Sequence, residues 1–221
     1  MGLALEVGIL ADLKANDEDG YQYFRHQFAL LNTLLAANHL PAHEEPEDVP
    51  VFGCDMYGYS GLHYLRRIAA HLLISGVVPN PCLDQPTHDS IYSKCYDNIA
   101  TMQDARSPME KRFDHLLCHS DNQGFYLPIK FDEVLVDSDE TGIEGVAVGS
   151  SITLERECTM LAHALNLPTE MDPADTFSDD IFETQGQGTG WGKYGIESST
   201  CILLLNAARH SIMTGAALVF T

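Results

Sequence analysis

The sequence predicts an α+β fold, a predominantly helical single domain over residues 1–221 with about six helices and a small β-sheet. The chain has 221 residues, of which 45% are hydrophobic, enough for a core of substantial size. Most apolar residues recur at helical spacing. Only short segments alternate with a period of two, and they do not follow the regular strand–helix order of an α/β fold.

Helical periodicity is clearest in residues 17–37. Asn16 or Asp17 can cap this helix, and its apolar residues at steps of three and four are Tyr21, Phe24, Phe28, Leu31 and Leu35. The same spacing predicts further helices over residues 3–14, 60–76, 91–102, 151–165 and 196–213. In addition, the segment Ser107–Glu110 has the residues of a capping box, with Pro108 at the first helical position, and predicts a helix that starts there.

Three segments are predicted to form the small sheet. Residues 51–54 are a short apolar run. In residues 125–136, apolar and polar side chains alternate as far as Phe131, and residues 134–136 either extend this strand or pair with it. Pro128 interrupts the alternation, which favours an edge strand or a bulge. Residues 216–220 complete the sheet as a terminal strand.

Two segments have the composition of exposed loops. Residues 41–50 have prolines at both ends and acidic residues between them. Residues 168–195 combine an acidic run with a glycine-rich run and are longer than an ordinary connection, which is typical of functional or disordered loops.

The charge is strongly negative and unevenly distributed. The chain has 32 acidic and 12 basic residues, a net charge of −20. Residues 1–60 carry ten acids and two bases, residues 61–120 six of each, and residues 121–221 sixteen acids and four bases. Such a surface repels nucleic acid and anionic membranes and attracts a basic protein. We therefore expect a basic protein partner.

Cysteines and the N-terminal residues favour a cytoplasmic protein. The six cysteines are widely spaced without a paired motif, and residues 1–7 lack a basic, apolar signal segment. No apolar stretch approaches the length of a membrane helix. Nothing in the sequence fixes the oligomeric state.

The strongest candidate interaction surface is the long C-terminal loop. It contains the only tryptophan, Trp191, between two glycines, and six residues define the predicted partner surface: Asp172, Asp175, Asp179, Asp180, Glu183 and Trp191. The simpler interpretation is a solvated acidic face with Trp191 packed locally. We hypothesise an acidic interaction protein, immunity- or inhibitor-like, that binds and neutralises a basic partner.

An alternative hypothesis is an enzyme or a small-molecule or metal-binding protein. His63, Arg67 and His71 are four residues apart and form one polar stripe, with Asp55 shortly upstream. Such a stripe can bind an anion, hold a metal or transfer protons. It can equally be a solvated helix face, and the sequence contains no catalytic motif that decides between the two.

A second histidine pair is the weak metal candidate. His115 and His119 are spaced as two ligands on one helix, but Leu116 stands where the zinc motif has glutamate and no third ligand is evident. We therefore predict no cofactor, with a divalent metal as the one option.

Overall fold

The computed structural model describes residues 3–56, 60–102, 106–137, 142–172 and 181–220. They form a predominantly helical α+β fold around a six-stranded mixed sheet of order β2-β1-β6-β3-β5-β4. The strands are β1 (Leu3–Val7), β2 (Phe52–Met56), β3 (Gly124–Leu127), β4 (Leu135–Val136), β5 (Ala147–Ser150) and β6 (Leu218–Phe220). The fold class predicted from the sequence is therefore confirmed.

Neighbouring strands pair antiparallel except for β3 and β5, which are parallel. The C-terminal strand β6 lies between β1 and β3, with Leu5 opposite Phe220 and Phe125 opposite Val219. The two ends of the described chain therefore meet in the centre of the sheet.

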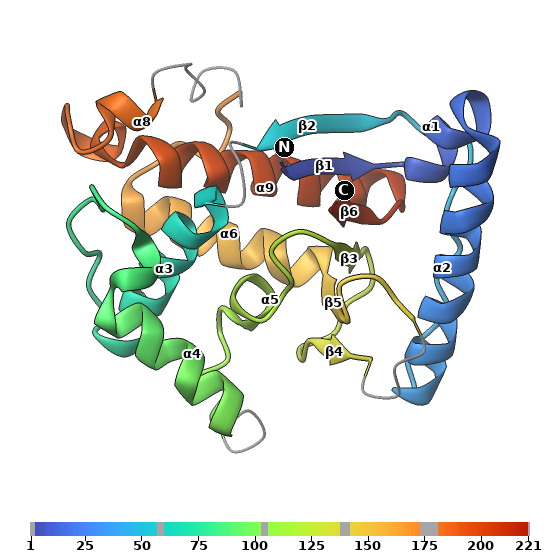
Figure 1. Cartoon of the computed structure of the whole chain (residues 1–221), viewed down its shortest axis with the longest axis horizontal. Helices are drawn as coiled ribbons and strands as arrows, with labels where there is room; N and C mark the ends of the chain where they lie inside the picture. The colour runs from blue at the N-terminus through green and yellow to red at the C-terminus, as the bar shows by residue number, and fades with distance from the viewer. Residues whose placement is uncertain (1–2, 57–59, 103–105, 138–141, 173–180, 221) are drawn as a thin grey trace.

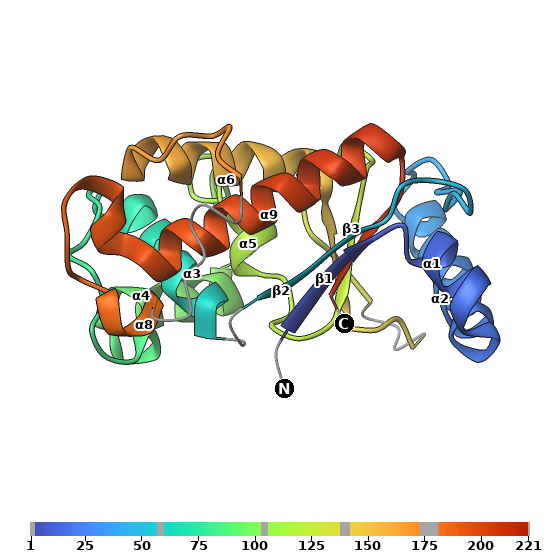
Figure 2. The same ribbon diagram turned by 90° about the horizontal axis from the view of Figure 1, so that it is seen from above.

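Helices cover both faces of the sheet. They are α1 (Ile9–Asn16), α2 (Glu18–Ala37), α3 (Ser60–Ile74), α4 (Ser90–Met102), α5 (Asp114–Leu117), α6 (Ser151–Leu165), α8 (Ile181–Thr184) and α9 (Gly195–Thr214), with single 3-10 turns η1 (Pro86–His88) and η2 (Gly190–Tyr194). Figure 1 shows the α1–α2 hairpin at one end of the molecule and α3, α4 and α8 at the other. In Figure 2, α6 and α9 run alongside each other above the strands.

The alternation of side chains along the strands separates two cores. Leu5 and Tyr126 point into the larger core, which α3, α6 and α9 complete. Phe125 and Val219 point to the opposite face, where they pack against Phe28 and the rest of the α1–α2 hairpin. The α1–α2 hairpin is thus held by its own core, which places it and its charged surface firmly on the sheet.

The prediction of a helix over residues 3–14 is wrong for the first half of this segment. Residues 3–7 are strand β1, and the helix begins only at Ile9. Gly8 lies between them with φ +88°, a left-handed conformation that favours glycine and breaks the regular structure. The side chains of Leu5 and Val7 fit a strand here because the sheet buries them completely.

The helix expected to start at Pro108 is also wrong. The carboxylate of Glu110 accepts hydrogen bonds from the backbone N–H and the hydroxyl of Ser107 at 2.7 Å each, as in a capping box. However, the chain continues as turns, and α5 spans only Asp114–Leu117. The capping contacts here close a turn rather than start a helix.

The two predicted loops are more ordered than their composition indicates. Residues 41–50 contain no helix or strand, but the side chains of His43 and Glu45 are buried, so this segment is not exposed throughout. Residues 181–195 contain α8 and η2. Residues 173–180 of the second loop lie outside the described residues.

Candidate functional site

The N-terminal end of the molecule combines a high negative charge with a firmly anchored backbone. Ten acidic and two basic residues lie within residues 1–60. Most of the acids are exposed or half-buried on α1, on the first turn of α2, on segment 41–50 and on strand β2. Asp17 caps α2 by accepting a hydrogen bond from the N–H of Gly20 at 3.1 Å, and Glu18 and Asp19 follow in the first turn.

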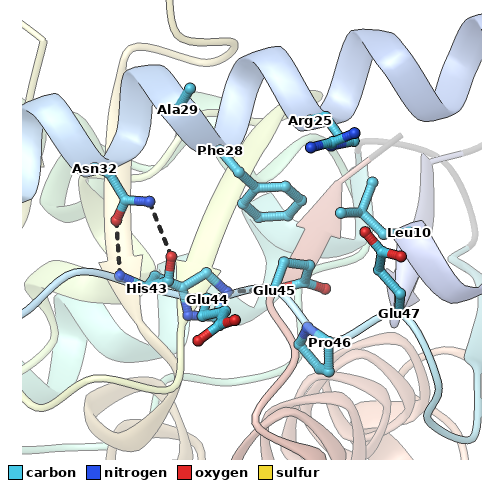
Figure 3. Close-up of a pocket in the computed structure, with 10 residues that line it drawn as sticks. All are labelled: Leu10, Arg25, Phe28, Ala29, Asn32, His43, Glu44, Glu45, Pro46 and Glu47. Atoms are coloured by element: carbon cyan, nitrogen blue, oxygen red, sulfur yellow. Dashed lines mark hydrogen bonds and ion pairs between the residues drawn. The ribbon is translucent and has the colours of Figure 1, made fainter.

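Segment 41–50 is fixed to α2 by partly buried hydrogen bonds and to the sheet by a buried one. The Asn32 side chain bonds both backbone groups of His43, at 2.7 Å to its nitrogen and 2.9 Å to its oxygen. The His43 ring lies 2.6 Å from the Glu45 carboxylate, which also accepts a bond of 2.8 Å from the N–H of Ala217. Figure 3 shows the contacts of His43 with Asn32 and with Glu45 beneath the Phe28 ring.

Burial raises the pKa of Glu45, and the bonds from His43 and Ala217 partly oppose this shift. The Glu45 side chain is only 1% exposed, and its Oε1 has no hydrogen-bond partner among the described residues. Glu45 is therefore an internal anchor, and it holds the neighbouring acids in place.

The residues on either side of this anchor face solvent. Glu44 and Asp48 are exposed, and Glu44 and Glu47 line an open hollow of about 630 Å³ between α2 and the segment. Glu47 accepts hydrogen bonds from Lys14 at 2.8 Å and from the Tyr21 hydroxyl at 2.6 Å. These bonds lower the pKa of Glu47, so its negative charge is maintained well into the acidic range.

Three further carboxylates lie together where strands β1 and β2 meet α1. Glu6, Asp12 and Asp55 line one hollow. Burial, and then the charge of Asp12, raise the pKa of Glu6. Glu6 and Asp12 are thus close enough to interact. Together with Asp55, they extend the acidic surface at the N-terminal end of the molecule. We call seven of these residues the N-terminal acidic surface: Asp12, Glu18, Asp19, Glu44, Glu47, Asp48 and Asp55.

The predicted C-terminal partner surface is described only in part. Asp172 and Glu183 are exposed, whereas Asp175, Asp179 and Asp180 lie outside the described residues. Trp191 is half-buried and packs against the larger core. This placement matches the simpler interpretation of Trp191 as a local plug more closely than that of a free anchor.

The structure does not bring the predicted His63 stripe together with Asp55. Asp55 lies on β2 with Glu6 and Asp12, whereas His63 lines hollows beside α4. The stripe itself is divided: the His63 ring lies 2.7 Å from the Tyr92 hydroxyl and 3.2 Å from a carboxylate oxygen of Asp121.

The other two members of the stripe bind a different carboxylate. Arg67 donates to Asp89 at 2.7 Å, and the His71 ring lies 3.0 Å from both oxygens of the same group. Burial opposes the charge of Asp89, but these two partners outweigh it and hold the pKa of Asp89 well below its usual range. Arg67 and His71 thus both bind the Asp89 carboxylate inside the protein, and the three residues of the stripe do not share one site.

Sequence reasoning missed Arg66, which is fully buried. Its guanidinium contacts the Asp121 carboxylate and donates to the carbonyl oxygens of Leu116 and His119 at 2.7 Å each. A signal was present, because Arg66 lies on the apolar face of its helix, four residues after Leu62.

The two histidines predicted as weak metal ligands, His115 and His119, contact other groups of the protein. The His115 ring nitrogen Nδ1 accepts the N–H of Ser150 at 2.9 Å, and the His119 ring stacks on Tyr126 at 4.0 Å. Burial lowers the pKa of both histidines to about 4. Within the described ranges, no group of three or more His, Cys, Asp or Glu residues is placed to hold a metal ion. None of the helices in the same residues has the length and apolar character needed to cross a membrane.

A comparison with protein families decides the classification. A family model described as "Putative DNA-mimic protein" matches residues 1–220. The chain belongs to this family. Comparisons with curated proteins and with solved structures gave no match.

Membership of the DNA-mimic family corrects the function predicted from the sequence. A DNA mimic implies a DNA-binding protein as its partner, and not a generic basic protein neutralised in the manner of an immunity or inhibitor protein. The expectation of a basic partner is confirmed at this coarser level, because DNA-binding surfaces are basic.

Proposed function

We propose that this protein binds the DNA-binding surface of another protein and competes there with DNA. The single observation that carries the proposal is the match to the DNA-mimic family over residues 1–220. The net charge of −20 and the exposed carboxylates support it. A surface that holds phosphates with lysine and arginine makes charge-assisted hydrogen bonds of the same kind with carboxylates.

We further propose that the N-terminal acidic surface forms the interface. Double-stranded DNA is a stiff polyanion with about one charge per 1.7 Å of axis. A protein that imitates it gains from carboxylates on a backbone that is already ordered, because less conformational entropy is lost on binding. The α1–α2 hairpin has its own core, and partly or fully buried bonds to Asn32 and Ala217 hold segment 41–50.

The distribution of the basic residues supports the same assignment. Three arginines are withdrawn from the surface into ion pairs with acids, and these pairs are Arg66–Asp121, Arg67–Asp89 and Arg106–Asp114. At the N-terminal end the bases are Lys14, which Glu47 neutralises, and Arg25. The carboxylates there therefore face a partner with little competing positive charge.

Release of proteins from a DNA column tests the proposal. A cell lysate is bound to immobilised double-stranded DNA at low salt and eluted with the purified protein, or with polyglutamate of equal charge as a control. We expect the protein to release one or a few DNA-binding proteins that polyglutamate leaves bound. Release of the same set by both polyanions, or of nothing by the protein, would overturn the proposal.

Two variants with the same change in charge locate the interface. Glu18→Lys/Glu44→Lys/Asp48→Lys alters the N-terminal acidic surface, and Asp84→Lys/Asp172→Lys/Glu183→Lys alters exposed acids at the opposite end, including two of the predicted C-terminal residues. We expect the first variant to release at least tenfold less of the partner and the second to resemble the wild type. The reverse result would favour the C-terminal surface instead.

A further inference from the structure

A hollow in the described part of this acidic molecule is lined by several basic residues, and the proposed DNA mimicry does not use it. The hollow has a volume of about 860 Å³ and lies between the turn before α5, residues 132–133 and α6. Four basic residues line it: Arg106, Lys111, Arg112 and Arg156. Small-molecule sites usually have volumes of about 300–1,000 Å³, so this hollow has the size of a ligand site.

Two of the four cations are neutralised within the protein. Arg106 forms a bidentate pair with Asp114 at 2.6 and 2.8 Å, with both side chains less than a tenth exposed. Lys111 donates to Glu133 at 2.7 Å. These two pairs fix the walls of the hollow and leave its other cations to a ligand.

Arg112 and Arg156 have no carboxylate partner in the part of the chain that the structure describes. Arg112 donates to the backbone oxygen of Leu72, and its guanidinium lies 5.2 Å from the centre of the Phe113 ring. Its Nε is buried without a hydrogen-bond partner among the described residues. Arg156 is exposed on α6. Asp132 is the one further carboxylate of the lining, so the hollow keeps a small excess of positive charge.

The walls are held in place before any ligand binds. Glu110 closes the turn on one side through its bonds to Ser107. On the other side, Thr153 on α6 donates to the backbone oxygen of Phe131 at 2.9 Å, next to Asp132. Because the walls are already ordered, little conformational entropy is lost when a ligand binds.

Methionines provide the apolar part of the lining. Met109 and Met160 both contribute, and Met109 is 66% exposed, an unusual position for a large apolar side chain. Thioether side chains are polarisable and adapt well to the faces of flat rings. The lining therefore suits a ligand with an anionic group and an apolar body.

The net charge of the molecule does not prevent an anion from binding here. Figure 1 places the α1–α2 hairpin at one end of the molecule, away from α4 and α5. At physiological ionic strength charges are screened over about 8 Å, so the carboxylates of the hairpin contribute little to the potential inside the hollow, where four basic residues face Asp132 and Glu133.

We propose that this hollow binds a small organic phosphate, of the class that nucleoside monophosphates represent. The guanidinium groups of Arg112 and Arg156 bind the phosphate, since their planar forks match its oxygens. Met109 and Met160 contact the apolar body. Asp132 and Glu133, at the rim, can accept hydrogen bonds from hydroxyl or amino groups of the ligand.

Calorimetric titration at 50 mM salt tests this site with three probes: adenosine monophosphate, inorganic phosphate and adenosine. We expect adenosine monophosphate to bind, inorganic phosphate to bind at least tenfold more weakly and adenosine not to bind. Arg156→Gln should weaken binding of the monophosphate about tenfold, whereas Lys94→Gln, which removes an exposed charge outside the hollow, should leave it unchanged.

Nuclear magnetic resonance locates the bound ligand without a substitution. The Nε–H signals of Arg112 and Arg156 should shift on addition of adenosine monophosphate. Absence of binding, equal binding of adenosine, or equal binding of inorganic phosphate would each overturn the proposal. So would an equal loss in Arg156→Gln and Lys94→Gln. None of these results depends on competition with DNA, so the two proposals fail separately.

Discussion

At the scale of single residues, buried polar groups determine how the acidic surface is displayed. Glu45 is a carboxylate that contributes no surface charge and instead joins segment 41–50 to strand β6 through Ala217. From the sequence alone, Glu45 is expected to be exposed like its neighbours Glu44 and Glu47, because nothing in the local sequence indicates that it is buried. The difference arises from a contact with a residue 172 positions away.

The variant Glu45→Ala should lower the free energy of unfolding by about 2–4 kcal/mol, because it leaves His43 and the N–H of Ala217 buried without their partner. Urea unfolding measures this change. Glu44→Ala removes a neighbouring carboxylate that is exposed and should change stability by less than about 0.5 kcal/mol. Equal effects of the two variants would contradict the role of Glu45 as an anchor.

His115 and His119 should both titrate near pH 4, because burial lowers their pKa to about 4. Unfolded histidines take up their proton near pH 6.5. Between these values the unfolded chain binds more protons, so each histidine lowers the free energy of unfolding as the pH falls from about 6.5 to about 4, by about 1.4 kcal/mol per pH unit. Proton resonances of the two rings measure the midpoints, and midpoints near 6.5 would show that the rings are hydrated.

At the scale of secondary-structure elements, local periodicity predicted the longer helices well. The expected helix 17–37 agrees with α2 (Glu18–Ala37), and the expected helix 151–165 with α6 (Ser151–Leu165). In both, a side-chain cap and a sustained apolar face agree with each other. Strand β5 (Ala147–Ser150) was missed, because four buried residues are too few to show alternation.

Local signals failed where a distant partner decides the structure. Residues 3–7 are apolar enough for a helix, yet they lie between β2 and β6 in the sheet. The Ser107–Glu110 box has the right residues for a helix start, but Arg106 and Asp114 hold the following chain in turns. The candidate stripe of His63, Arg67 and His71 was correct in spacing, but its carboxylate partners lie on other elements.

Helix α4 depends on Asp89 at its start. One carboxylate oxygen accepts the N–H groups of Ile91 and Tyr92 at 2.9 and 3.1 Å, while the same group binds Arg67 and His71. Asp89→Ala should therefore lower the free energy of unfolding by about 3–5 kcal/mol, since it removes a cap and leaves a buried arginine unpaired. Chemical denaturation measures the loss.

Asp89→Asn serves as the matched comparison, because asparagine keeps the cap but removes the charge. It should be less destabilising than Asp89→Ala by about 1 kcal/mol. If both variants are as stable as the wild type, the ion pair with Arg67 and His71 does not hold α4 to α3.

At the scale of the whole molecule, the charge predicted the class of partner but not its identity. The net charge of −20 indicated a basic partner and excluded nucleic acid as a ligand. The charge could not show that the partner's basic surface is one that binds DNA, because every acidic protein that binds a basic partner is negatively charged. The family match supplied that information.

The location of the acidic surface also required the fold. By sequence, the C-terminal residues 121–221 carry the largest excess of acids. The structure shows that the N-terminal acids gather on elements that share a core and a network of partly or fully buried hydrogen bonds. The sum of charges along the sequence does not reveal this arrangement.

Binding should weaken steeply as the salt concentration rises. Salt screens the attraction between the carboxylates of this protein and the basic residues of its partner, and its anions compete for those basic residues. Measured association rates should fall in parallel with affinity between 50 and 300 mM salt. A salt-independent affinity would indicate an apolar interface and not an imitation of DNA.

The central claim is that the protein and DNA occupy the same surface of one partner. The most direct test is fluorescence anisotropy of a labelled 20-base-pair duplex bound to the DNA-binding protein that the column experiment recovers. We expect increasing amounts of the protein to release the duplex completely, with an apparent Kd for DNA that rises in proportion to the concentration of the protein. A ternary complex, seen as an anisotropy that increases or stays constant at saturation, would contradict the account.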